Sequence, residues 1–209
     1  MNSKIPIFPL NLVMYPDAIY PLHIFEERYK KMIKSCRNER TGFGIVSKFD
    51  SEISTVGCYV EIIEIYNTYD NGNIDILIKG IHRFQTISTS LNKNGYIEAF
   101  IIPYEDIDDR FNNIELRERT TSKFKKILQK TDIDLGQKYW NRFKKASRKS
   151  FKIAEKSGLN LRQQQNLLAL QSESDRLSYL YEHFNKLERF IERSDIIKEI
   201  VSGDGYFNE

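Results

Sequence analysis

The sequence predicts an α+β fold in which a β-barrel precedes a bundle of α-helices. Four of the five prolines lie within the first 21 residues, and no proline follows Pro103. Short β-branched and aromatic runs separated by turn signals fill the chain up to that point, whereas helical spacing of apolar residues dominates after it. This change predicts two domains, residues 1–110 and 111–209, joined near Asp106–Asn113.

The opening segment KIPIFPLNLVMYPDAIYPL combines large apolar residues with four prolines. Proline cannot donate a ladder hydrogen bond, so it belongs at strand edges and strand starts. We therefore predict an edge strand followed by an apolar loop that covers the barrel. The next segment, FEERYKKMIKSC, has apolar residues at helical spacing and acidic residues before basic ones, which predicts a helix near residues 25–37.

Short segments with turn residues between them predict the remaining strands of the barrel. These segments are residues 42–48, 56–70, 73–80, 81–88 and 96–105. Asn71-Gly72 supplies the positive φ angles of a tight hairpin, so the strands on either side of it should pair antiparallel. In NIDILIKG, Ile74, Ile76 and Ile78 alternate with residues of the opposite face. Many short strands at this spacing favour a closed or nearly closed barrel over a parallel sheet.

Helical spacing and capping residues predict four helices after the junction. They run from Asn113 to about Lys130, from Gly136 to Lys156, from Asn160 to about Leu170, and over residues 174–201. Asn160 and Gln163 can form a capping box, and Ser174 can cap the last helix. The apolar stripe of that long helix requires a partner, so we expect the helices to pack together or on the barrel.

Several motifs occur in a familiar order: IPIFPLNLVMYPDAIYPLHIFEERYKKMI, GFGIV, VGCYVEIIEIYNTYDNGNIDILIKGIHRF, YIEAFIIPYED and LNLRQQQNLLALQSESDRLSYLYEHF. Together they resemble the N-terminal substrate-binding domain of Lon proteases over about residues 1–200. The resemblance implies a PUA-like pseudo-barrel followed by a helical bundle. It also implies a module that recognises proteins or exposed polypeptide segments, as an adaptor or a regulator of proteolysis.

A full Lon protease also carries an ATPase module and a serine-lysine protease module. No glycine in this sequence is followed by lysine, so the phosphate-binding loop G-x-x-x-x-G-K-[ST] is absent. We therefore expect no catalytic residue, no cofactor and no hydrolysis by this chain. The N-terminus lacks a signal peptide and no apolar run could span a bilayer, which predicts a cytoplasmic protein without a membrane partner.

Metal binding is not expected either. The three histidines, His23, His82 and His183, and the two cysteines, Cys36 and Cys58, show none of the spacings of a zinc site. Reduced, buried cysteines fit a reducing compartment. His82, with its neighbour in the matched segment, Arg83, is expected to tie strands together.

The first candidate site is a protein-binding surface on the loop Tyr15–Leu22 and the start of the following helix. Its members are large apolar residues flanked by charges, namely Tyr15, Ile19, Tyr20, Glu26, Glu27, Arg28 and Lys31. Apolar patches rimmed by polar residues are typical of protein recognition. An alternative stays open, in which the loop is only the lid of the barrel.

The second candidate site is the basic helix predicted over residues 138–156, with nucleic acid as the alternative partner. The first 112 residues carry a net charge of −3 and the remainder +6, out of +3 in total. Among the eight Lys and Arg residues of this helix, the candidate binding residues are Arg142, Lys145, Arg148, Lys149 and Lys152. Such composition can bind phosphate backbones. Tyr139 and Phe143 fall on the opposite face, so a merely solvated basic face is the preferred interpretation.

Overall fold

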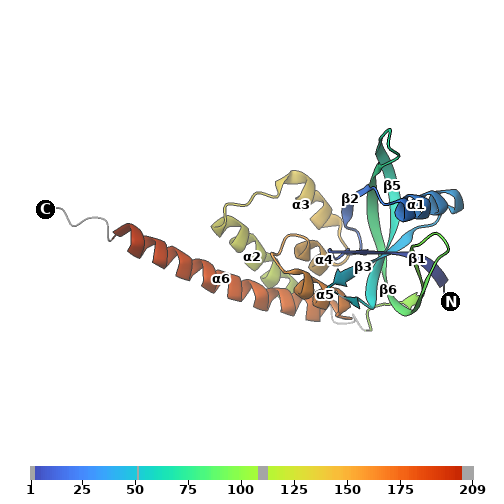
Figure 1. Cartoon of the computed structure of the whole chain (residues 1–209). Coiled ribbons are helices and arrows are strands. Elements are labelled where there is room, and N and C mark those ends of the chain that lie inside the picture. The colour runs from blue at the N-terminus through green and yellow to red at the C-terminus, as the bar shows by residue number, and fades with distance from the viewer. Residues whose placement is uncertain (1–2, 51, 108–112, 204–209) are drawn as a thin grey trace. The chain divides into compact units, whose positions relative to one another are not determined.

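The computed structural model describes residues 3–50, 52–107 and 113–203. Strands occupy the first half of the chain and helices the second, which confirms the predicted α+β class (Figure 1). The predicted junction near Asp106–Asn113, with the acidic pair Asp108-Asp109, lies largely outside the described residues.

The chain divides into two compact units, and the first is discontinuous in sequence. It comprises Met1–Asp108 together with Gly158–Gln171, whereas the second comprises Asp109–Ser157 and Ser172–Glu209. The short helix predicted from Asn160 therefore belongs with the strands, although the sequence placed it among the helices of residues 111–209.

The described part of the first unit contains seven strands, and five of them form a closed ring. The seven strands are β1 Ser3–Leu10, β2 Ile19–Ile24, β3 Phe43–Phe49, β4 Glu52–Ile53, β5 Val56–Thr68, β6 Ile74–Leu91 and β7 Ile97–Pro103. The order β1-β7-β6-β5-β3 is antiparallel throughout, and a parallel pairing of β1 with β3 closes the ring. This closure is the barrel that the strand spacing predicts. The segments predicted as separate strands at 73–80 and 81–88 are one continuous strand, β6.

The hairpin of β5 and β6 extends beyond the ring, and Figure 1 shows it standing out with β2 on one side and the helix α1 on the other. Gly72 has a φ of 78° at its tip, as the Asn-Gly turn predicts. The first half of β6 pairs with both β2 and β5. The side chains of Ile76 and Ile78 on β6 are buried, which confirms the alternation in NIDILIKG.

Helix α1, Glu27–Glu39, buries one apolar face against the barrel. Met32, Ile33 and Cys36 on this face are buried, and the ring of Tyr29 stacks on Phe8 at 3.9 Å. The prediction that the helix includes Phe25 was wrong. The backbone of Glu26 is extended, with φ −72° and ψ 132°, so the helix starts after it and the Phe25 side chain is exposed.

The loop between β1 and β2 covers the barrel, which agrees with the alternative interpretation that this loop is the lid of the barrel. Tyr15 is 2% exposed, and its hydroxyl donates to the carbonyl of Gln164 at 3.3 Å. The amide of Asp17 donates to the carbonyl of Gly80, and a Cβ at Gly80 would lie 2.1 Å from the carbonyl oxygen of Tyr15. The loop is therefore fixed by backbone contacts on a strand residue that has to be glycine.

Helix α5, Leu161–Ala169, is joined to the strands by buried polar groups. The Gln165 amide donates to the carbonyl of Val56 at 3.0 Å, and the Ser47 hydroxyl lies 2.8 Å from its Oε1. The capping box of Asn160 and Gln163 is present as predicted.

Arg83 closes the other end of α5. Its guanidinium donates to the carbonyls of Leu168 and Leu170 at 2.6 and 2.7 Å and pairs with Asp106. The expectation that Arg83 ties strands together was therefore wrong, because these contacts join β6 to a helix end and to a carboxylate. His82 of β6 does contact a neighbouring strand, because its ring stacks on that of Tyr59, its register partner on β5, with centroids 5.0 Å apart.

The second unit contains helices only. They are α2 Ile114–Lys130, α3 Gly136–Lys145, α4 Lys149–Ala154 and α6 Glu173–Gly203. Phe124 of α2 stacks on Phe184 of α6 in its core. Arg176 is fully buried and bound to Glu173, which also accepts from the Ser150 hydroxyl.

The structure corrects two helix boundaries in this unit. The helix predicted over Gly136–Lys156 is broken into α3 and α4, because Ala146 is extended and the Lys149 ammonium donates to the carbonyls at the end of α3. The last helix starts at Glu173, and Ser172 rather than Ser174 accepts from the amide of Asp175. None of the described helices is long and apolar enough to cross a membrane.

Candidate functional site

The part of the first unit that extends beyond the ring is a three-stranded sheet of β2, β6 and β5. In its register, Asp75 of β6 lies opposite His23 on one side and Asn67 on the other. Directly opposed residues of antiparallel strands share a face, so these three side chains form one row across the sheet. The sequence separates His23 from Asp75 by 52 positions, and only the pairing of β2 with β6 brings them together.

A carboxylate organises this row. His23 Nδ1 lies 2.6 Å from Oδ1 of Asp75, and the Tyr69 hydroxyl donates to Oδ2 at 2.7 Å. The hydrogen bond from His23, followed by that from Tyr69, holds the pKa of Asp75 below its usual range. The same hydrogen bond raises the pKa of Tyr69, because the carboxylate favours the protonated phenol. Asp75 therefore stays ionised and fixes both rings.

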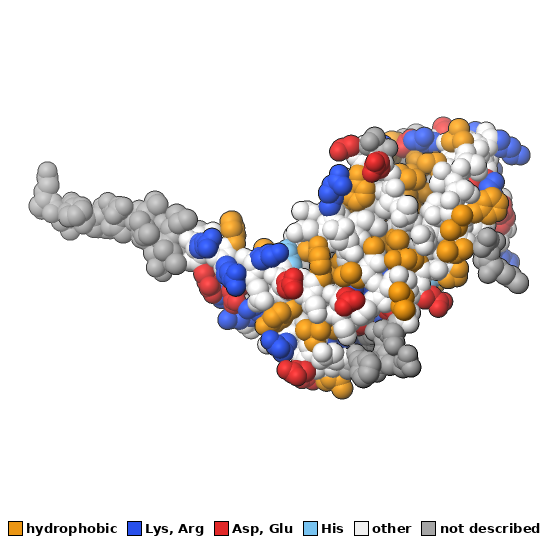
Figure 2. Space-filling model, turned by 90° about the horizontal axis from the view of Figure 1, so that it is seen from below, with side chains coloured by type: hydrophobic (Ala, Val, Ile, Leu, Met, Phe, Trp, Pro, Cys, Tyr) orange, Lys and Arg blue, Asp and Glu red, His pale blue; other side chains and the backbone are white. Residues whose placement is uncertain are grey.

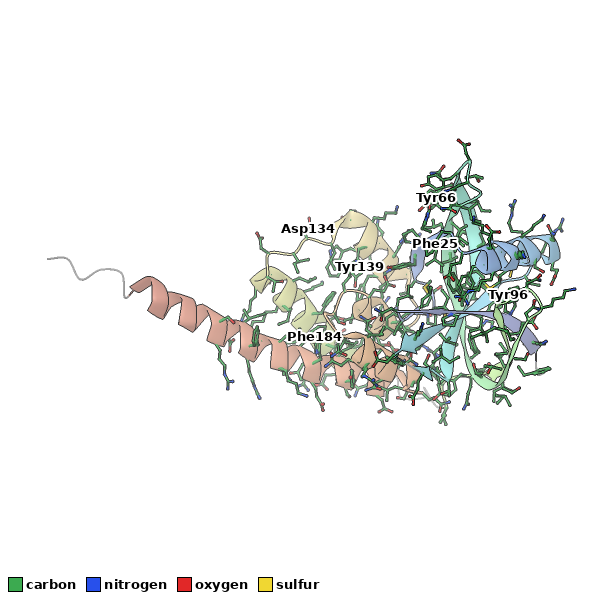
Figure 3. All side chains as sticks on the ribbon, in the orientation of Figure 1. Phe25, Tyr66, Tyr96, Asp134, Tyr139 and Phe184 are labelled. Atoms are coloured by element: carbon green, nitrogen blue, oxygen red, sulfur yellow. The ribbon has the colours of Figure 1, made fainter. Side chains whose placement is uncertain are left out.

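Two aromatic rings flank the histidine. Phe25 stacks on His23 with centroids 6.0 Å apart, and Tyr69 meets His23 edge-on at 5.6 Å. Phe25 is 61% exposed and Tyr69 is 42% exposed. We call His23, Phe25, Tyr69 and Asp75 the hairpin face; Figure 3 labels Phe25 on it and Tyr66 on the same hairpin. Exposed rings held by a polar network lose little conformational freedom on binding a partner.

Irregularities in strand pairing add further apolar groups to the surface of the first unit. The register shifts of β6 with β5 and with β7 each insert one extra residue, and these residues are Ile63, Tyr66, Ile81 and Ile87. All four side chains are large, apolar and exposed. A β-bulge interrupts the ladder and redirects the extra side chain. Figure 2 shows apolar side chains gathered on one face of this unit with few charges among them.

The residues of the predicted protein-binding surface differ in burial and lie on different elements of the structure. Tyr15 is buried, so the expectation that it is partly exposed was wrong. Ile19 is half-buried and Tyr20 is exposed, both on β2. The charged members lie at the start of α1, where Arg28 pairs with Glu26 at 2.6 Å, Glu27 pairs with Lys30, and Lys31 is exposed.

Sequence reasoning missed the members of the hairpin face. His23 and Phe25 follow the predicted loop directly, and Tyr69 and Asp75 flank the Asn-Gly turn. The available signal was the predicted hairpin itself, because the turn places the residues on either side of it near one another. No local pattern in the sequence indicates the register in which β2 pairs with β6.

The predicted basic surface is only partly exposed. Lys152 is 4% exposed and bound to Glu155 at 2.7 Å, which contradicts its place on a solvated face. The Lys149 ammonium donates to three backbone carbonyls; burial, followed by the nearby Arg117, lowers its pKa. Arg142, Lys145 and Arg148 are half-buried or exposed. Nucleic-acid binding by these residues stays a prediction, and no contact among the described residues of the second unit favours it.

No group of three or more His, Cys, Asp or Glu side chains in the described part of the chain could hold a metal ion. Cys36 and Cys58 are free and buried. Burial raises the pKa of the Cys36 thiol to about 11 and that of Cys58 to about 12, so both thiols stay protonated and unreactive at neutral pH.

The family model of the ATP-dependent protease La (LON) substrate-binding domain matches residues 4–186. The chain belongs to this family. The family resemblance of the sequence motifs is thereby confirmed, and the match is to the substrate-binding domain of Lon.

Solved structures of Lon N-terminal domains share the fold. A Lon N-terminal domain protein from Xanthomonas campestris is 24% identical, with a TM-score of 0.64, covering 85% of this chain and 96% of that chain. The N-terminal domain of a Mycobacterium avium complex Lon protease is 15% identical, with a TM-score of 0.65, covering 88% and 98%.

A Lon protease of Buchnera aphidicola subsp. Baizongia pistaciae is 26% identical over 191 residues, which are 85% of this chain and 24% of that protein. The chain therefore spans about a quarter of the length of this curated relative.

Proposed function

We propose that this Lon-type domain binds exposed apolar segments of other polypeptides on its hairpin face. The observation that carries the proposal is the pair of solvent-exposed rings, Phe25 and Tyr69, held in place by His23 and Asp75. Unfolded segments present apolar and aromatic side chains without a fixed shape. A shallow aromatic surface accepts many such segments, whereas a deep polar pocket selects one ligand.

The proposed role needs no chemistry from the chain. Binding at this surface would serve recognition, as an adaptor or a regulator of proteolysis, with polypeptide substrates or a partner protein as the ligand. The two free cysteines fit a reducing, cytoplasmic setting.

The test compares paired variants in one binding assay. Phe25→Ser with Tyr69→Ser should weaken binding of a chemically unfolded model protein about tenfold or more, because both rings lose their apolar contact area. The matched control is Phe190→Ser with Ile133→Ser, which removes two exposed apolar side chains of the second unit. Circular dichroism checks that each variant is folded. Equal affinity of both variants and the parent would contradict the proposal.

A further inference from the structure

The outer edge of β5 lacks a neighbouring strand beyond the ring. β5 pairs with β3 through Cys58–Val60, and among the described residues Glu61–Thr68 pairs with β6 alone. The opposite edge of the three-stranded sheet is β2, where Pro21 removes one backbone donor. β5 contains no proline, so its outer edge keeps all of its amide donors and carbonyl acceptors.

This edge opens into a groove. The groove has a volume of about 580 Å³ and lies between Glu61–Ile65 and the last turn of α1 with the residues after it, including Cys36, Arg37, Arg40 and Thr41. The helix forms a wall, so an extended segment could lie between it and the strand. The pairing of a peptide with an exposed sheet edge relies on main-chain hydrogen bonds and therefore tolerates many sequences.

The walls of the groove carry opposite charges. Arg37 and Arg40 line the α1 side, whereas Glu61 and Glu64 line the strand side. All four side chains are exposed, and none of them has an ion-pair partner within 4.0 Å among the described residues. Opposite charges on directly facing strand residues stabilise a sheet. A segment added to this edge therefore gains from basic side chains opposite Glu61 and Glu64.

The same features disfavour a second copy of the chain as the occupant. Two β5 edges paired antiparallel would bring the glutamates of one copy close to those of the other, and like charges across strands are destabilising. The bulges at Ile63 and Tyr66 also interrupt the long regular pairing on which edge-to-edge association depends. A short, extended segment of another polypeptide avoids the repulsion between glutamates, and along Glu61–Ile65 it meets only the bulge at Ile63.

We propose that the outer edge of β5, at Glu61–Ile65, captures an extended polypeptide segment as an added strand, with basic side chains opposite Glu61 and Glu64. The inference rests on the proposed function and specifies how one segment of the bound polypeptide is held. Main-chain pairing at the edge complements the aromatic contacts of the neighbouring hairpin face.

The decisive probe is a fluorescent decapeptide of alternating lysine and valine, made in three forms. One form has a normal backbone, and the other two carry N-methyl groups on alternate amides, each on a different set. An added strand donates hydrogen bonds to β5 through one set only. One methylated form should therefore bind about tenfold more weakly, while the other keeps its affinity within about twofold. Equal binding of the two methylated forms would overturn strand addition.

Protein variants locate the edge. Glu61→Lys with Glu64→Lys should weaken binding of the unmethylated decapeptide about fivefold or more, because the lysines then face like charges. Asp50→Lys with Glu52→Lys, two exposed acidic residues outside the groove, changes the net charge equally, serves as the matched control and should change the affinity less than about twofold. Equal losses in both variants would show non-specific attraction of a cationic peptide and would overturn the assignment.

The outcomes separate this inference from the proposed function. If the unfolded model protein binds through Phe25 and Tyr69 while the two methylated decapeptides bind equally, strand addition is wrong and the hairpin face stands. If the unfolded protein does not bind, the proposed function fails first. A dimer in sedimentation analysis that the glutamate variants dissociate would show that a second copy occupies the edge, which also overturns the inference.

Discussion

Two polar clusters of the first unit are built alike and differ in burial. Arg83 and Asp106, beside the end of α5, have side chains that are 4% and 7% exposed. His23 and Asp75 of the hairpin face are 49% and 13% exposed. Each pairs a carboxylate with a basic group distant in sequence, but only the second leaves rings and polar atoms open to solvent.

The difference in burial indicates that the two clusters have different roles. A buried charge left without its partner is strongly destabilising, because water cannot solvate it. An exposed pair contributes little to stability, because water solvates each partner nearly as well. We therefore assign the Arg83 cluster to the fold and the hairpin face to recognition. Three measurements test this division between stability and recognition.

The largest effect is expected at Arg83. Arg83→Met removes the buried guanidinium that donates to the Asp106 carboxylate and to the carbonyls of Leu168 and Leu170, and we expect a loss of about 3–5 kcal/mol in the free energy of unfolding. Urea denaturation measures it. Arg28→Met removes an exposed arginine and should cost less than about 1 kcal/mol. Similar losses in the two variants would break the comparison.

An intermediate effect on stability is expected at Glu188 in the second unit, whose side chain is 13% exposed. Hydrogen bonds from Lys123 and Lys126 lower the pKa of its carboxyl from 4.5 to about 2. A group whose pKa is depressed on folding stabilises the protein above its unfolded pKa and loses that contribution as the pH falls. The extra stability of the parent over Glu188→Gln should therefore fade between pH 4.5 and about pH 2. A difference that does not depend on pH would contradict the assignment.

The smallest effect on stability is expected at Asp75. Asp75→Asn removes the carboxylate that holds His23 and Tyr69, yet the His23 side chain is 49% exposed, so the midpoint of urea unfolding should hardly move. Binding of an unfolded model protein should weaken, because the rings of the hairpin face lose their fixed orientation. A large shift in the midpoint with unchanged binding would show that Asp75 stabilises the fold and does not contribute to recognition.

Local signals in the sequence were sufficient for several elements. The Asn71-Gly72 turn and the Asn160–Gln163 capping box depend on residues close in sequence, and both are present. The barrel followed from the number and spacing of short strands. These features need little information from the rest of the fold.

Long-range contacts account for what the sequence did not predict. The return of α5 to the strands depends on Gln165 and Arg83, whose partners lie up to 118 positions away. The hairpin face depends on the register of β2 on β6, and the exposed bulge residues depend on shifts that no local pattern indicates. Lys152 is buried because its ammonium pairs with Glu155 and lies over the ring of Tyr139, 13 residues earlier.

Site-specific photocrosslinking tests the central claim most directly. A photoreactive phenylalanine analogue placed at Tyr66, next to the hairpin face, is compared with the same analogue at Ile133 in the second unit; both positions are exposed. With a labelled unfolded protein, we predict crosslinks from position 66 that excess unlabelled unfolded protein suppresses, and few from position 133. Crosslinks that arise mainly from position 133, or that competition does not reduce at position 66, would contradict recognition by the hairpin face.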